Sequence, residues 1–212
     1  MNNLKRLFTA AISVFSLASF SADAAFINFN DYTTSGYGNQ YKSGDATSSA
    51  DGSTLTLTGN LWVSLSEMFN VTSDSTLYFT LEASGVEAEW YGIGFDNNNT
   101  ITANTLFQLG GNESTSANQI LAYDFGDGAV DFAINVGSAF TGVFDRLVFI
   151  LDADSMSGAS LAFSNVEVCN DVAGCASLAG APSAPTAVSA PGAGGLLALS
   201  LLTLVARRRL KA

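Results

Sequence analysis

Apolar and polar residues alternate along much of this chain, with the period of two that a half-buried β-strand requires. The segment Thr54–Thr58 alternates Thr with Leu, and polar residues separate Leu77, Phe79 and Leu81. The pattern continues in residues 91–95. Further strands are predicted over residues 105–109, 120–125, 129–136, 147–151 and 159–168.

Turn-forming sequences separate these segments, and no window has a convincing helical period. All three prolines lie beyond residue 181, so none interrupts a predicted strand. Eight or more short strands predict an all-β fold. We expect an antiparallel β-sandwich of the jelly-roll type, in a single domain over residues 26–176.

The body of the chain is strongly acidic. Residues 25–190 hold eighteen Asp and Glu against two basic residues, Lys42 and Arg146. Such a surface repels nucleic acid and anionic lipid, so neither is an expected partner. The chain has no histidine, which excludes Ser-His-Asp and Cys-His catalysis and the usual zinc hydrolases. Because no cofactor motif is present either, we expect a protein that is not an enzyme.

Several aspartates are candidate ligands for a structural Ca²⁺ ion, which takes six to eight oxygen ligands. Asp152 and Asp154 alternate directly after the apolar segment 147–151, so both could point at one ion. Asp45, Asp51 and Asp96 are the other candidates. The alternative is that all of these are acidic side chains in solvated loops.

Trp90 is the candidate for contact with a sugar. Gly92 and Gly94 share its face of an extended strand, so its ring would lie uncovered and could stack on a pyranose. Glu87 and Glu89 would then bond the sugar hydroxyls. The alternative is that Trp90 is a packing residue and that the glycines allow close approach of another backbone segment.

The two cysteines, Cys169 and Cys175, enclose five residues. In an exported protein such a pair predicts a disulfide, here one that fastens the end of the last strand. A metal role is not expected, because the spacing is not C-x-x-C and no histidine exists to complete a zinc site.

Both ends of the chain predict export. Residues 1–24 have the basic start, apolar centre and Ala-Asp-Ala ending of a secretory signal peptide. An Ala/Ser/Pro linker (177–190) leads to an apolar run at 192–206, which three arginines follow. As a helix this run would be about 22 Å long, shorter than the ~30 Å hydrocarbon core of a bilayer. It therefore predicts a short transmembrane helix and a temporary anchor, with the arginines on the cytoplasmic side.

The tail, residues 191–212 with the motif just before them, resembles the PEP-CTERM class of bacterial sorting signals. The residues that carry the resemblance are Val188, Ser189, Ala190, Pro191, Arg207, Arg208 and Arg209. The motif is a variant of the usual Val-Pro-Glu-Pro. The resemblance implies cleavage near the motif by a membrane protease of the exosortase type. Gly194-Gly195 is also similar to tails cut by rhomboid-type proteases, and an ordinary single-span anchor is a further alternative.

A second resemblance covers most of residues 26–168. Its matching pieces include Gly44-Asp45, Asp51-Gly52, residues 55–62, residues 93–96, residues 107–110, residues 144–149, residues 152–154 and residues 163–166. These are similar to the calcium-associated jelly-roll modules of secreted polysaccharide-degrading enzymes. The resemblance implies a carbohydrate-binding role, in a module that here stands without an attached catalytic domain.

These features predict an exported, non-catalytic protein of the cell surface or extracellular matrix, linked to exopolysaccharide or biofilm. We expect passage through the inner membrane, transient anchoring by the C-terminal helix, and then a place on the cell surface or outside the cell. The alternative function is a lectin-like, carbohydrate-binding module that uses Trp90 as an exposed platform.

Overall fold

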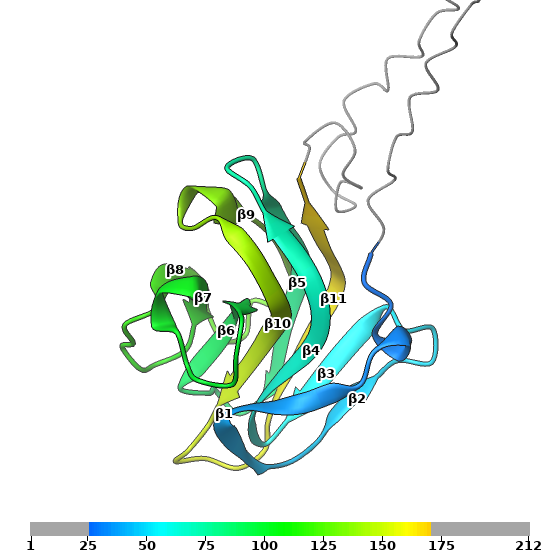
Figure 1. Cartoon of the computed structure of the whole chain (residues 1–212). Helices are drawn as coiled ribbons and strands as arrows, with labels where there is room; N and C mark the ends of the chain where they lie inside the picture. Colours follow the sequence, from blue (N-terminus) through cyan, green and yellow to red (C-terminus); the bar gives the residue numbers. More distant parts are fainter. Residues whose placement is uncertain (1–25, 171–212) are drawn as a thin grey trace, which may run out of the picture. The chain divides into compact units, whose positions relative to one another are not determined.

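The computed structural model describes residues 26–170, which form two β-sheets packed face to face (Figure 1). The six-stranded sheet has the order β1 (Thr34–Ser43), β4 (Asn60–Val71), β10 (Gly142–Asp152), β6 (Trp90–Asp96), β7 (Leu106–Gly110) and β8 (Asn118–Tyr123). The five-stranded sheet has the order β2 (Ala46–Ser48), β3 (Thr54–Thr58), β11 (Ala159–Cys169), β5 (Thr76–Gly85) and β9 (Val130–Ile134). Among the described residues, the 3-10 helix η1 (Phe29–Asp31) precedes β1, and η2 (Ala103–Thr105) and η3 (Val136–Ser138) each connect two strands. Within residues 26–170 no helix has the length and apolar character needed to span a bilayer.

The main core lies between the two sheets and follows from the alternation in the sequence. In β5 the apolar positions Leu77, Phe79 and Leu81 are fully buried, while the residues between them face outward. Phe163 of β11 packs against Phe149 of β10 across the sandwich, with ring centroids 5.0 Å apart. Removing these apolar surfaces from water is the main stabilisation of the fold.

The predicted β-sandwich is confirmed, and each of the eight predicted segments corresponds to a strand. Strands β1, β2 and β4 were not predicted. Residues 60–65 of β4 are buried on both faces, so their sequence does not alternate. One pair departs from the antiparallel pattern, because β7 and β8 run parallel.

Several predictions concern residues outside the described range. They are the signal peptide, the linker 177–190, the sorting motif Val188–Pro191, and the apolar run with Arg207, Arg208 and Arg209. Cys169 ends β11, is buried and is not a free thiol. Its predicted partner Cys175 also lies outside the described range, so the disulfide between them stays a prediction.

Candidate functional site

A second cluster of buried side chains lies on the outer face of the six-stranded sheet. Its members are Tyr37, Trp62, Trp90, Leu106, Ala117, Val148 and Ile150. Their neighbours along the strands, such as Leu61, Tyr91 and Phe149, belong to the core between the sheets. Since successive side chains of a strand point to opposite faces, the second cluster must lie on the other side of the sheet.

Trp90 is one of the buried members of this outer cluster, with 5% of its surface exposed. Its ring lies over Gly92 of its own strand, where a Cβ would collide with Nε1 of the indole. Trp62 of β4 packs against it edge-on, with ring centroids 4.8 Å apart and planes at 80°. The expectation of an uncovered Trp90 platform is therefore wrong, because the glycine makes room for the tryptophan ring itself.

Three carboxylates gather where β6 begins and β10 ends. Strand pairing places Asp152 opposite Trp90, and Glu89 immediately precedes Trp90. One carboxylate oxygen each of Glu89, Asp152 and Asp154 lies within 4.8 Å of the other two. The structure thus brings a predicted sugar ligand, Glu89, together with two predicted calcium ligands. We call these three carboxylates and the Trp62 indole the carboxylate–indole site.

Glu89 fixes the turn that follows β10. Its Oε2 accepts hydrogen bonds from the backbone N–H of Asp154 (2.5 Å) and of Ser155 (3.3 Å), and its Oε1 accepts one from the Ser155 hydroxyl (2.7 Å). The Ser155 hydroxyl, followed by these N–H groups, lowers the pKa of Glu89, so the carboxylate stays ionised. Asn60 supports the same turn, because its Nδ2 donates to Asp154 Oδ1 at 2.6 Å.

Asp152 is the half-buried carboxyl of the site. Burial, followed by the negative charges of Asp154, Glu113 and Glu89, raises its pKa from 3.8 to about 6, and the Trp62 indole opposes this rise. No Lys or Arg is among the groups that set this pKa. The site therefore holds excess negative charge at neutral pH and would gain from any hydrogen-bond donor or cation that entered it.

The Trp62 indole supplies an unused donor beside these acceptors. Trp62 is 4% exposed, and its Nε1 has no hydrogen-bond partner. The indole is close enough to Asp152 to lower the pKa of that carboxyl, but it does not reach hydrogen-bonding geometry with it. A buried N–H without a partner costs stability, so this donor is poised to bond an added acceptor.

The remaining predicted ligands lie apart from this cluster. Glu87 is exposed, and Asp96 is buried and accepts the Tyr37 hydroxyl at another part of the sheet. Asp45 lies at the turn before β2 and pairs through its backbone with Thr58. Asp51 lies in a turn where the Ser49 hydroxyl and then the Ser53 N–H and hydroxyl lower its pKa to about 2. A single calcium site made from all of these aspartates is therefore not what the structure shows.

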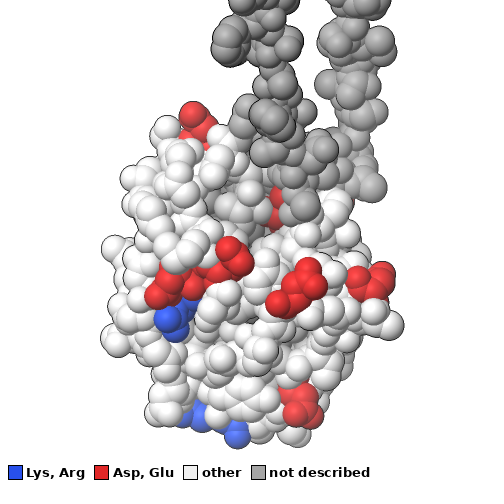
Figure 2. Space-filling model, turned by 45° about the vertical axis from the view of Figure 1, so that its right-hand side comes forward, with Lys and Arg blue, Asp and Glu red and all other residues white. Residues whose placement is uncertain are grey.

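A Ca²⁺ ion at this place would be held by Glu89, Asp152 and Asp154, since clustered carboxylate oxygens are its preferred ligands. Sequence reasoning did not single out Asn60 or Trp62 for the site. Both belong to β4, whose doubly buried start hid the strand. The usable signal was the run Asn60-Leu61-Trp62, in which polar and aromatic residues share a face. Figure 2 shows how far Asp and Glu outnumber Lys and Arg on one face of the molecule.

No protein-family model and no curated protein matches the chain. Among solved structures, the chain is similar to a family 29 carbohydrate-binding module complexed with cellulohexaose. The identity is 18% and the TM-score 0.40, with 68% of this chain and 87% of that one covered. A low-affinity xylan-binding module from Roseburia intestinalis has 14% identity and a TM-score of 0.32, with 65% and 92% covered. The glycoside hydrolase domain of Endo-D from Streptococcus pneumoniae R6 has 10% identity and a TM-score of 0.43, with 66% and 22% covered.

Proposed function

We propose that the protein is an exported, non-catalytic carbohydrate-binding protein whose carboxylate–indole site receives the hydroxyl groups of a neutral glycan. The observation that carries this proposal is the buried N–H of Trp62, which has no hydrogen-bond partner, beside the half-buried Asp152 carboxyl. A sugar would meet the three carboxylates, and one of its hydroxyls would reach the buried Trp62 N–H once the covering side chains moved aside, in place of the stacking platform expected from the sequence.

A hydroxyl group suits this site because it both donates and accepts a hydrogen bond. It can donate to the Asp152 carboxylate while its oxygen accepts the N–H of Trp62. A Ca²⁺ ion would satisfy the carboxylates alone and would leave the indole donor without a partner. Vicinal hydroxyls of a pyranose present such groups in pairs, and carboxylates accept them with charge-assisted bonds.

The charge of the site selects among glycans. Glu89, Asp152, Asp154 and the nearby Glu113 are all acidic, and burial and mutual repulsion already raise the pKa of Asp152. A uronate or sulfated sugar would add like charge to this group, which costs affinity. Neutral polysaccharides are therefore the proposed ligands.

The predicted leader and tail remain part of the proposal. A signal peptide at 1–24 and a sorting signal at 191–212 would deliver the domain to the cell surface or the extracellular matrix. There a module that binds neutral polysaccharide would associate with exopolysaccharide. A membrane protease of the exosortase type, or alternatively of the rhomboid type, is the proposed processing partner.

The test removes the N–H of Trp62 and keeps an aromatic ring. We expect Trp62→Phe to weaken retention on neutral polysaccharides by about tenfold, the value of one lost hydrogen bond. The measurement is affinity electrophoresis against a panel of neutral and anionic polysaccharides. Trp90→Phe is the matched control, because the Trp90 N–H is also buried without a partner but, unlike Trp62, Trp90 is not among the groups that shift the pKa of Asp152.

Equal retention of both variants and the unmodified protein would rule out this site as the glycan site. Retention on none of the panel would reject the carbohydrate-binding function itself. New reducing ends after incubation with a retained polysaccharide would contradict the non-catalytic part of the proposal.

A further inference from the structure

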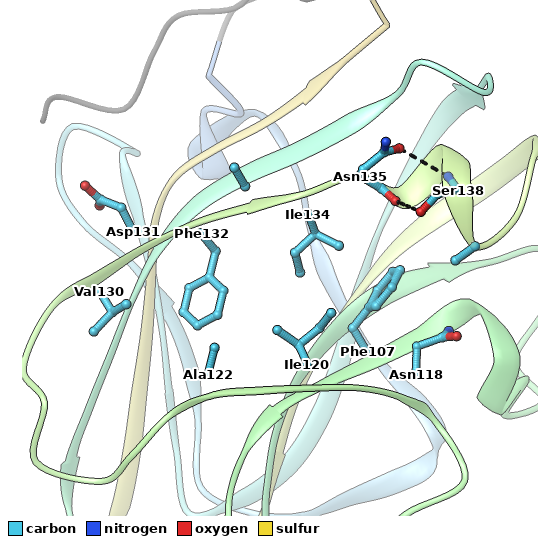
Figure 3. A pocket seen from close by; sticks show the side chains of 12 residues that line it. Phe107, Asn118, Ile120, Ala122, Val130, Asp131, Phe132, Ile134, Asn135 and Ser138 are labelled. Carbon is cyan, nitrogen blue, oxygen red and sulfur yellow. Dashed lines mark hydrogen bonds between the residues drawn. The ribbon is translucent and has the colours of Figure 1, made fainter. Parts of the chain in front are cut away.

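An apolar slot opens along one side of the sandwich, two strands beyond β6 in the six-stranded sheet. It has a volume of about 500 Å³ and lies between β8 and β9, the last strands of their sheets on that side. In Figure 3 Phe132 and Ile134 of β9 point toward Ala122 and Ile120 of β8, with Phe107 at the floor. Polar groups lie at its ends, where Asn135 and Ser138 bond each other.

The strands beside the slot differ from the strands at the opposite edges of the sheets. There, β1 is polar, carries Lys42 and has two register shifts, and β2 is three residues long. Such features protect a sheet edge from pairing with another chain. In contrast, β8 has no charged residue, and its Ile120 and Leu121 are 38% and 55% exposed. The slot side of the molecule is thus the unprotected side.

Of the two strands, β9 is the one with a regular free edge. It pairs residue by residue with β5 from Leu81↔Val130 to Leu77↔Ile134, and no other strand in the described part of the chain pairs with it. Its one charged side chain, Asp131, accepts the Thr80 hydroxyl of β5 at 2.7 Å, so it is held toward the neighbouring strand. In β8 the left-handed backbone of Leu121 (φ 48°) interrupts a regular edge.

The charge around the slot defines the partner. Asp124, Asp127 and Asp131 lie in β9 and in the connection between β8 and β9, and residues 104–140 contain no Lys or Arg. A partner segment with basic residues would gain from these aspartates. A second copy of this chain would not, because it would bring the same aspartates and a body with seventeen acidic and two basic residues at 26–170.

We infer that this side of the molecule is a protein-docking site, at which an extended segment of a different protein adds to the free edge of β9. Alternate apolar side chains of that segment would fill the slot above Ile120, and basic residues at its ends would face the aspartates. Main-chain bonds to an edge strand supply affinity in such additions, and the pocket supplies specificity.

The probe is an acetylated, amidated peptide that alternates Val and Thr over five residues and has Lys at both ends. We expect it to bind the purified domain, with slowed amide exchange in β9. The Ile120→Asp variant should bind it at least about tenfold more weakly, because a charge would be buried in the slot. Leu121→Asp is the matched control, since it adds the same charge to the same strand outside the slot lining.

Peptide variants test the chemistry of the partner. Glu in place of the terminal Lys residues should abolish binding. Two further peptides carry N-methyl groups on alternate residues, one on the odd-numbered and one on the even-numbered residues. Because only one edge of the peptide pairs with β9, one of these peptides should lose binding and the other should keep it. Equal binding of both N-methylated forms would overturn strand addition. Equal loss in Ile120→Asp and Leu121→Asp would overturn the slot as the specificity pocket, and a stable homodimer in sedimentation would overturn the choice of partner.

Discussion

At the scale of single residues, the sequence singled out Glu89, Asp152 and Asp154, which the structure brings together, but divided them between two separate sites. Trp90 and Glu89 were assigned to a sugar, and Asp152 and Asp154 to calcium. Antiparallel pairing of β6 with β10 places Asp152 opposite Trp90 and so unites them. Register depends on contacts between distant segments, which alternation along one strand does not reveal. The prediction that Trp90 is exposed was wrong for a related reason. Trp62, which packs against Trp90, comes from a strand that the pattern did not show.

The raised pKa of Asp152 predicts an unusual pH dependence of stability. Its pKa of about 6 lies above the ordinary 3.8, so the folded protein takes up this proton before the unfolded chain does. The ionised Asp152 carboxylate destabilises the folded protein fully above pH 6, and this cost is relieved as the pH falls from 6 toward 4. After discounting for the solvent that reaches this half-buried group, the gain is about 1 kcal/mol.

We therefore expect the domain to have a higher free energy of unfolding at pH 5 than at pH 7, as measured by urea denaturation. Asp152→Asn should be more stable than the unmodified protein at pH 7 and should lose most of this pH dependence. Asp45→Asn removes the same charge from a residue that is not among the groups acting on Asp152 and serves as the control. If Asp152→Asn keeps the full difference between pH 5 and pH 7, another group is responsible.

At the scale of elements, the turn after β10 is the part of the fold that the site depends on most. Glu89, the residue before β6, accepts hydrogen bonds from two backbone N–H groups and one hydroxyl of this turn. Strands such as β5 were predictable because they bury one face, and β6, which is buried on both faces, was predictable because glycines alternate with large apolar residues in it. The start of β4 and the polar β1 were not, because burial on both faces or on neither leaves no period of two. The slot also escaped prediction, since edge positions are set by sheet order.

We expect Glu89→Ala to free this turn. Loss of its three hydrogen bonds should lower the free energy of unfolding by about 1 kcal/mol, with faster amide exchange at Asp154 and Ser155. If Ca²⁺ binds the three carboxylates, it should raise the melting temperature of the unmodified protein and not of Glu89→Ala.

Glu87→Ala is the matched control for this substitution, because Glu87 lies two residues earlier, is exposed and is not one of the three clustered carboxylates. A calcium-dependent rise of equal size in both variants would place any bound ion elsewhere.

At the scale of the whole molecule, charge limits the choice of partners more than shape does. The described residues include two basic side chains, and one of them, Arg146, pairs with Asp145 at 2.7 Å. Neutral glycans at one site and a basic, apolar segment at the other are compatible with this charge. The excess of acidic residues was evident from the sequence alone. The separation of the two sites came from the order of strands in the two sheets.

The tail makes a prediction for the whole chain in its native host. We expect the mature protein to begin near residue 25 and to end near residue 190, as measured by intact mass in the surface and medium fractions. Replacement of Arg207, Arg208 and Arg209 by Ser should leave longer precursor in the membrane fraction. A mature mass that extends to Ala212 in the membrane would indicate a permanent anchor instead.

The contact between Trp62 and Trp90 has a spectroscopic consequence. These are the two tryptophans of the entire chain, and their ring centroids are 4.8 Å apart beside the carboxylates. All indole fluorescence therefore originates in one place, and two transition dipoles this close should produce an exciton couplet in circular dichroism. The protein thus carries its own optical reporter, in which a ligand or a proton arriving at Asp152 can be followed without a label.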